Sequence, residues 1–324
     1  MNRKLVGYLL GAILLIEAAC MVPALVVALI YQDEDVWAMG KAILLLAAIG
    51  APMRFGIRPQ ERNLRAREGF LVVALAWVAL SCFGALPFVF SGLIPNYIDA
   101  LFESVSGFTT TGATVLTQFD DLPQGIIFWR SFTHWIGGMG VLVFVLMVMP
   151  MNNDNSMHLV RAEVPGPTAG KLVPRMRTTS MILYGIYAAM TLILILLLLA
   201  FGMQPFDTFC IAFGTAGTGG FAVSSAGIAG YNSLAIEIIL GIFMLLFGIN
   251  FNVYHLLLLR KFREAFSMEE IKVYLGIAAF AVVSITVNIA GMVGNVGTAL
   301  RQAFFQVSSI LTTTGFSTVD YEAW

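Results

Sequence analysis

Three short segments of the chain place threonines directly before a glycine, a pattern that can supply oxygen ligands to a monovalent cation. Aligned without gaps, they read DALFESVSGFTTTGA from Asp99, DTFCIAFGTAGTGGF from Asp207 and QAFFQVSSILTTTGF from Gln302. A dehydrated cation needs several oxygens at once, and successive backbone carbonyls supply them without a fixed charge, so the ion can leave again. Glycine accepts a positive φ, which turns successive carbonyls the same way, and it lets the backbone approach the ion path.

The alignment defines nine candidate residues of a cation selectivity filter. The first two segments share an Asp 13 residues before the glycine (112 minus 99, and 220 minus 207), and this spacing favours Gly220 over Gly219 as the equivalent position. A single TTTG is weak, because threonines precede glycine in many loops and helix caps, whereas three aligned copies favour a filter. The candidates are Thr110, Thr111 and Gly112 in the first segment, Thr218, Gly219 and Gly220 in the second, and Thr313, Thr314 and Gly315 in the third.

The composition places these segments in a membrane protein. The 324 residues are 59% hydrophobic and only 11% charged, which is far more apolar than a soluble domain. About 20 apolar residues are needed to cross a bilayer as a helix, and seven stretches approach or meet this length. These predicted crossings are Leu5–Ile30, Trp37–Met53, Gly69–Ser91, Ile126–Pro150, Met181–Met203, Leu234–Leu259 and Val273–Gly294.

The distribution of basic residues predicts the orientation of the crossings. Lys and Arg gather between the second and third stretches, between the fourth and fifth, and after the sixth, and such loops are typically cytoplasmic. The N-terminus is then cytoplasmic, and the threonine–glycine segments lie on the outer side. Segments 98–116, 206–223 and 302–319 are too apolar for ordinary loops and too short to cross, so we expect re-entrant loops.

The order of crossings and re-entrant segments predicts an internal repeat. Each unit is a helix, a short pore helix, an extended loop and a second helix, and the copies are related by an axis along the membrane normal. The predicted fold is therefore an all-α polytopic membrane protein with potassium-channel-like parallel repeats around a central pore. Expected divisions are an N-terminal helix pair with a basic loop (1–68), pore repeat 1 (69–160), pore repeat 2 (161–264) and an incomplete pore repeat 3 (265–324).

The same residues resemble the membrane subunits of the bacterial Trk and Ktr potassium-uptake family, most closely the TrkH type. The resemblance covers essentially the whole chain and rests on FESVSGFTTTGATVL from Phe102, HWIGGMGVLVF from His134, RAEVPGP from Arg161, GTGGF from Gly217 and SSILTTTGFSTVDYEAW from Ser308. It implies potassium transport across the bacterial cytoplasmic membrane, with potassium as the ligand and no bound organic cofactor. It also implies a homodimer and a cytoplasmic, nucleotide-binding, TrkA-like regulatory partner.

The sequence departs from this family at its end. Family members have a fourth repeat with a fourth filter glycine, and a glycine-rich gate in the second helix of the third repeat. This chain ends at Trp324, just after the third filter segment. We expect a truncated chain that does not conduct alone.

Other function classes agree less well with the residues. Another potassium or sodium channel or transporter is the alternative, and a membrane scaffold without a pore is a weaker one. A membrane enzyme would need a carboxylate pair, a metal cluster or a nucleophile with its base at membrane depth, and the sequence places none there. Nothing indicates nucleic-acid binding.

Three polar residues inside apolar stretches have structural interpretations. Arg130, near the outer end of the fourth crossing, is expected to anchor its helix by reaching the interface or by pairing with Glu103 or Asp120. Asn250 and Asn252, near the inner end of the sixth crossing, could form hydrogen bonds between helices.

Overall fold

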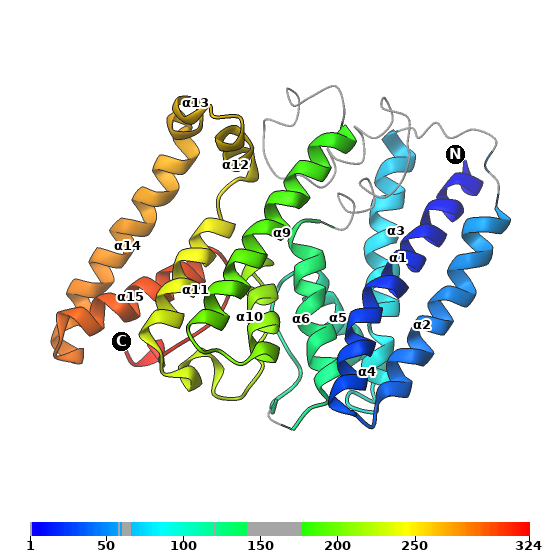
Figure 1. Ribbon diagram of the computed structural model, residues 1–324, viewed down its shortest axis with the longest axis horizontal. Coiled ribbons are helices and arrows are strands. Elements are labelled where there is room, and N and C mark those ends of the chain that lie inside the picture. The colour runs from blue at the N-terminus through cyan, green and yellow to red at the C-terminus, as the bar shows by residue number, and fades with distance from the viewer. Residues whose placement is uncertain (1, 58, 60–65, 120, 141–175) are drawn as a thin grey trace. The chain divides into compact units, whose positions relative to one another are not determined.

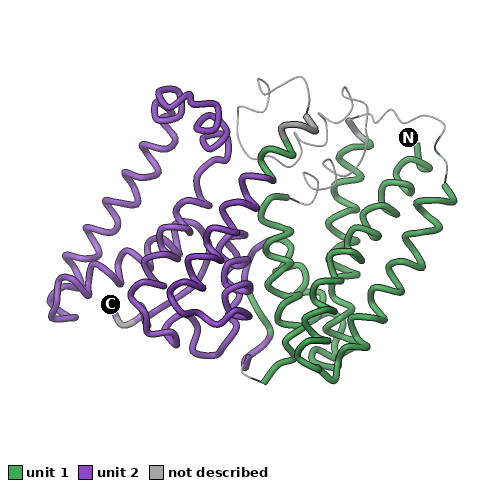
Figure 2. The backbone as a smooth tube through the Cα atoms, in the orientation of Figure 1, with its two compact units in different colours: residues 1–109, 113–115, 121–184 green, residues 110–112, 116–120, 185–324 purple. Residues whose placement is uncertain are grey.

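The computed structural model describes residues 2–57, 59, 66–119, 121–140 and 176–324, and helices are the only regular elements in this part of the chain. The chain forms two compact units, which Figure 2 colours separately. Unit 1 comprises residues 1–109, 113–115 and 121–184, and unit 2 comprises residues 110–112, 116–120 and 185–324. The first threonine–glycine triplet therefore belongs to the same unit as the second and third.

Unit 1 is built on the long first helix (Figure 1). This helix contacts α2, α3 and α6, while α5 lies between α3 and α6. Close approach of α1 and α2 depends on small residues: a Cβ on Gly11 would lie 2.7 Å from the backbone nitrogen of Arg54, and one on Gly50 would lie 3.0 Å from the carbonyl oxygen of Gly11. The helices are α1 (Arg3–Tyr31), α2 (Val36–Ala51) with the π-helical turn η1 (Pro52–Gly56), α3 (Ala66–Gly84), α4 (Leu86–Phe90), α5 (Tyr97–Phe108) and α6 (Gln124–Gly138).

Unit 2 contains the remaining long helices, beginning within α9, whose first turns belong to unit 1. Helix α15 contacts both α11 and α14, and α10 contacts α11. Gly294, with a φ of 73°, ends α14, and the side chain of Asn295 then caps α15, so one tight turn joins the two helices. The helices are α9 (Met176–Ala200), α10 (Pro205–Ala216), η2 (Gly227–Tyr231), α11 (Leu234–Phe247), α12 (Phe251–Leu258), α13 (Phe262–Ser267), α14 (Glu269–Val293), α15 (Val296–Leu311) and η3 (Tyr321–Ala323).

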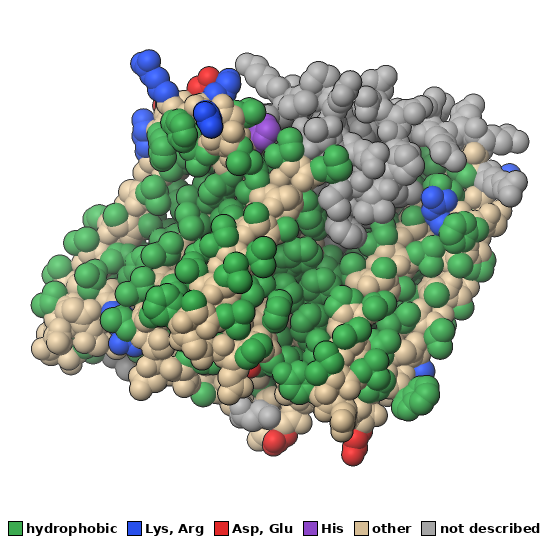
Figure 3. All heavy atoms as spheres, viewed as in Figure 1, with side chains coloured by type: hydrophobic (Ala, Val, Ile, Leu, Met, Phe, Trp, Pro, Cys, Tyr) green, Lys and Arg blue, Asp and Glu red, His purple; other side chains and the backbone are tan. Residues whose placement is uncertain are grey.

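The predicted crossings agree with the helices over most of their length. Within the residues that the structure describes, five helices are long and apolar enough to cross a membrane, and the bent pair α11 and α12 adds a sixth if it is one span. Hydrophobic side chains cover much of the visible face over α9, α11 and α14, and Lys and Arg gather at the α12–α13 end (Figure 3). The predicted crossing Ile126–Pro150 begins as α6, and residues 141–150 lie outside the described residues.

The expectation of one continuous sixth helix over Leu234–Leu259 is wrong. Helix α11 ends at Phe247, and α12 leaves it at 90°. The Oδ1 of Asn250 accepts a hydrogen bond from the Asn252 nitrogen at 3.0 Å and so starts α12. The Nδ2 of Asn250 also donates to Glu270 of α14 at 3.4 Å, which is the bond between helices that the sequence predicted for Asn250.

Two tyrosine hydroxyls bind carbonyls of the last turn of α11. Tyr254 donates to the Leu246 oxygen at 2.6 Å, and Tyr274 of α14 donates to the Leu245 oxygen at 3.1 Å. These bonds replace the helical partners that the break removes.

Candidate functional site

Each threonine–glycine triplet follows directly after a short helix. Helices α5 and α15 begin at asparagine caps: Asn96 accepts from the Ile98 nitrogen at 3.0 Å, and Asn295 accepts from the Gly297 nitrogen at 2.8 Å. Helix α10 begins with Pro205. The backbone N–H at the first position of a helix has no helical acceptor, so proline there loses no hydrogen bond. The C-terminal end of each helix, which carries the negative end of the helix dipole, therefore leads into the triplet.

Helices α10 and α15 end in the same backbone motif. The Gly219 nitrogen donates to the Gly214 oxygen at 2.9 Å, and the Thr314 nitrogen donates to the Ser309 oxygen at 2.8 Å. One residue earlier, Thr218 and Thr313 donate to carbonyls three residues before them, at 3.1 and 3.0 Å. This is the Schellman arrangement, and it turns the chain sharply from helix into extended loop.

The triplets share an alternating backbone in which the first and third residues have positive φ. The glycines have φ of 77° at Gly112, 69° at Gly220 and 88° at Gly315. Positive φ occurs at Gly220 and not at Gly219, which is the register that the alignment predicts. The threonines two residues earlier have φ of 55° at Thr110, 53° at Thr218 and 60° at Thr313.

Positive φ at these threonines is the feature that sequence reasoning missed. A β-branched residue in the left-handed region is an outlier, and such a conformation costs on the order of 1–3 kcal/mol. The usual residue at this place in a helix end is glycine. The same strained conformation occurs at all three threonines, and a glycine-centred motif search gives no signal for it.

The triplets contact one another in chain order within unit 2. A Cβ built on Gly112 would overlap the carbonyl oxygen of Gly219, and a Cβ built on Gly220 would overlap the carbonyl oxygen of Thr314. In both cases the oxygen belongs to the residue just before the next glycine. The three loops therefore pack backbone to backbone, through equivalent contacts that require the glycines.

The other candidate threonines differ in exposure. Thr314 is buried, and its hydroxyl lies 2.7 Å from that of Thr312, which in turn donates to the Ser308 oxygen at 2.7 Å. Thr111 is exposed, and Thr110 and Thr218 are half-buried. The hydroxyl of Thr314 thus holds the third loop against its helix.

Different side chains support the second and third loops. In the third, the Ser309 hydroxyl donates to the Phe316 oxygen at 2.6 Å, just beyond Gly315. Beside the second, the Tyr231 hydroxyl donates to Asp207 at the start of α10 at 2.6 Å. Burial, and then this hydrogen bond, raise the pKa of Tyr231, so the phenol stays a neutral donor.

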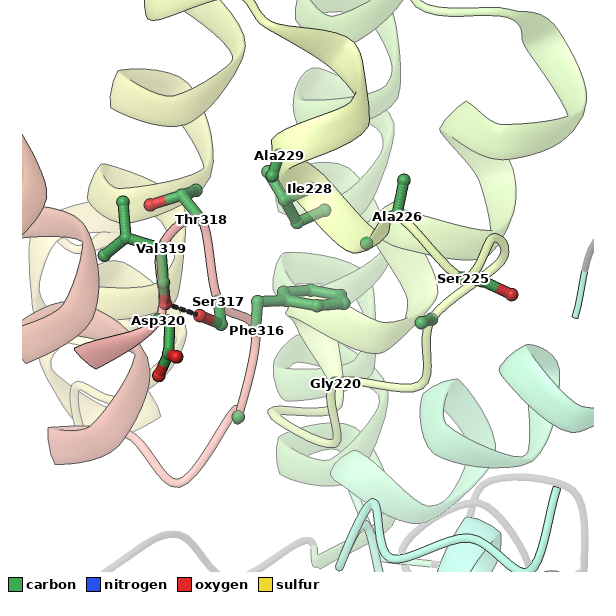
Figure 4. Close-up of a pocket in the computed structure, with 13 residues that line it drawn as sticks. Gly220, Ser225, Ala226, Ile228, Ala229, Phe316, Ser317, Thr318, Val319 and Asp320 are labelled. Carbon is green, nitrogen blue, oxygen red and sulfur yellow. Dashed lines mark hydrogen bonds between the residues drawn. The ribbon is translucent and has the colours of Figure 1, made fainter. Parts of the chain in front are cut away.

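A hollow of about 520 Å³ opens beside the second and third glycines. Gly220 and Gly315 line it together with residues 225–229 and 316–320 (Figure 4). The hydroxyl of Ser317 donates to the Val319 oxygen at 2.6 Å, which folds the segment after Gly315 along one wall. The carboxylate of Asp320, exposed in this wall, adds negative charge where a cation would approach.

Comparison with known proteins identifies relatives for nearly the whole chain. Residues 38–287 match the family described as TrkH, cation transport protein. The chain is 36% identical over 330 residues to the Trk system potassium uptake proteins TrkH of Salmonella typhimurium (strain LT2) and Escherichia coli (strain K12), covering 100% of this chain and 68% of each relative. It is also similar to the crystal structure of the potassium transporter TrkH from Vibrio parahaemolyticus, with a TM-score of 0.87 and 31% identity over 100% of this chain and 67% of that one.

Proposed function

The chain belongs to the TrkH family of cation transport proteins, and on this premise we propose that its three threonine–glycine loops form the potassium selectivity filter of a Trk-type uptake system. The protein is a membrane subunit for potassium transport. The nine residues named from the sequence are the proposed ion-binding residues, and their backbone carbonyls are the proposed ligands.

The mutual packing of the loops is the observation that carries this proposal. Gly112 and Gly220 each lie against the carbonyl of the next loop, at equivalent positions. Three loops in such succession place several carbonyl groups close together, which is what a dehydrated monovalent cation requires. The helix ends before the loops add negative potential without a fixed charge.

The ion path then follows from the parts. A hydrated cation enters the hollow bordered by Gly220 and Gly315, where Asp320 raises its local concentration. In the loops, carbonyl oxygens replace its water, and neutral ligands allow it to leave on the other side. Selection of potassium over sodium then depends on the number and arrangement of these carbonyl oxygens.

The surrounding assembly follows from the family. We place the chain in the bacterial cytoplasmic membrane. Its N-terminus is inside, because alternate loops are rich in Lys and Arg and such loops are typically cytoplasmic. Pairing as a homodimer and gating by a nucleotide-binding, TrkA-like subunit are part of the same proposal. The division into pore repeats at 69–160, 161–264 and 265–324 remains a prediction.

The test is to replace each of the three glycines by serine in the protein expressed from its own gene. Gly112→Ser, Gly220→Ser and Gly315→Ser add a side chain at a positive φ and disturb the carbonyl arrangement. In cells without other potassium-uptake systems, we expect each variant to lower the ratio of potassium to sodium uptake by about tenfold or more, which corresponds to ~1.4 kcal/mol. Unchanged ratio and rate in all three would refute the filter assignment.

A matched control separates selectivity from backbone strain. Gly202 also has a positive φ, of 87°, and lies outside the loops, and a Cβ there meets no atom of the described residues within 4 Å. Gly202→Ser should therefore carry the same conformational penalty and keep the normal ratio of potassium to sodium uptake. A scaffold without a pore predicts no ion effect for any of the four variants.

A further inference from the structure

The first loop is tied to its pore helix by a buried carboxylate. Glu103 of α5 is fully buried, and its Oε1 accepts a hydrogen bond from the Thr114 hydroxyl at 2.9 Å. Its Oε2 accepts one from the Val115 backbone nitrogen at 3.0 Å. Both oxygens thus bind the chain immediately after Gly112, so the position of this carboxylate determines where the outer end of the first loop lies.

The carboxylate is itself held by a buried cation. Arg130 of α6 is 1% exposed, and its Nε donates to Glu103 Oε1 at 2.5 Å. This confirms the pairing of Arg130 with Glu103 that the sequence offered as one possibility. Because the two charges cancel, the pair can support the loop without placing a net negative charge beside the ion path.

Neighbouring contacts fix Arg130 in place. The indole of Trp129 donates to the Gly84 oxygen at 3.0 Å and meets the ring of Phe108 edge-on, at 6.0 Å between centroids. The Thr133 hydroxyl donates to the Arg130 oxygen at 2.6 Å. Helices α3, α5 and α6 are joined by these bonds, so Glu103 cannot move without disturbing a packed core.

The equivalent positions in the other two loops carry no charge. The offsets between aligned glycines (220 minus 112, and 315 minus 112) place Ile211 and Gln306 opposite Glu103. The third loop uses hydroxyls instead, from Ser309 and Thr312. Among the described residues, an ion pair that also binds the loop is thus specific to the first triplet, and the loops are supported asymmetrically.

We propose that Glu103 and Arg130 are positioning residues that fix the carbonyls of Thr110, Thr111 and Gly112 for potassium. The inference rests on the filter assignment and adds the residues that set its geometry. Neither side chain is a ligand of the ion: the Glu103 oxygens are occupied by loop donors and by Arg130. Discrimination between potassium and sodium depends on small differences in carbonyl position, which a loosened loop does not maintain.

The experiment compares variants that break different bonds of the cluster. Glu103→Gln removes the negative charge and places an amide N–H₂ opposite groups that are themselves donors: the Thr114 hydroxyl, the Val115 nitrogen and Arg130. Thr114→Val removes one loop bond and leaves the ion pair intact. The exchange of charges, Glu103→Arg with Arg130→Glu, restores an ion pair but no acceptor for the loop. The readout is the ratio of potassium to sodium uptake at equal amounts of protein in the membrane, with the gene product at its natural length.

A positioning role predicts a particular ranking. A hydrogen bond to a charged group is worth about tenfold to a hundredfold in an equilibrium. We expect Glu103→Gln to lower the uptake ratio by about tenfold or more. We expect a smaller loss, of about threefold, for Thr114→Val, because the bond from the Val115 nitrogen to Glu103 still holds the loop and only part of the lost bond energy reaches the carbonyls. The exchanged pair should recover protein in the membrane but not selectivity. If Thr114→Val and the exchanged pair both keep the normal ratio, the ion pair only holds the helices together and the proposal is wrong.

The filter variant Gly112→Ser, measured in parallel, separates this outcome from failure of the filter itself. A lowered ratio in Gly112→Ser with a normal ratio in Thr114→Val and the exchanged pair overturns the positioning role alone. A normal ratio in Gly112→Ser as well overturns the filter assignment. Should Glu103→Gln not reach the membrane, Thr114→Val and the exchanged pair still decide the question.

Discussion

Alanine at Gly220 should destabilise the protein more than alanine at a glycine of similar conformation elsewhere. Gly220 has a φ of 69° and Gly202 one of 87°, so each alanine loses about 1–2 kcal/mol by entering the left-handed region. At Gly202 nothing further is lost, because the Cβ meets no atom of the described chain within 4 Å. At Gly220 the Cβ overlaps the Thr314 carbonyl oxygen, a backbone atom that cannot rotate away.

The size of the difference can be estimated from the overlap. Forcing an extra carbon into a packed site costs about 1–3 kcal/mol, so Gly220→Ala should total roughly 2–5 kcal/mol. The assay is thermal unfolding of the purified protein in lipid nanodiscs containing potassium. We expect Gly220→Ala to unfold about 2–4 °C below Gly202→Ala. Equal unfolding temperatures would mean that the second and third loops do not touch, and the proposed carbonyl arrangement would lose its basis.

Two further predictions concern the support of unit 2. Tyr254→Phe and Tyr274→Phe each remove a donor from a carbonyl at the end of α11, and each should lower the free energy of unfolding by about 1 kcal/mol, measured by thermal unfolding. The control is Tyr321→Phe, at an exposed position. Equal stability of all three variants contradicts this account of the bend. Arg301 donates two hydrogen bonds of 2.5 Å to the carboxylate of Glu237. The Arg301 side chain is 34% exposed and that of Glu237 is 6% exposed. A double-mutant cycle with Glu237→Gln and Arg301→Gln should give a coupling energy of about 1 kcal/mol, and a value within ~0.3 kcal/mol of zero shows that the pair does not hold α15 to α11.

The sequence predicts most of the helices because apolar length is a strong signal. Stretches such as Leu5–Ile30 and Val273–Gly294 correspond to α1 and α14 within a few residues. The register of the three loops was also predictable, since glycine spacing and the shared aspartate are visible in the residues themselves. The positive φ at Gly220 falls in that register.

The remaining features depend on contacts between distant residues. Residues 234–259 are apolar almost throughout, so their hydrophobicity does not reveal the break after Phe247. A tyrosine 29 residues after Leu245 helps to stabilise this break. The left-handed threonines are equally invisible, because propensity assigns that conformation to glycine. For Arg130 the sequence offered two partners, Glu103 and Asp120, and only the packing of α5 against α6 selects Glu103.

The break between α11 and α12 also bears on how the chain is made. During synthesis, residues 234–259 are presented to the insertion machinery as one apolar run. Hydrophobicity alone identifies this run as a single transmembrane segment. The hydroxyl that satisfies the Leu245 carbonyl belongs to Tyr274, which leaves the ribosome later. The bend in its final form must therefore wait for α14, and membrane insertion and folding of this segment are separate events in time.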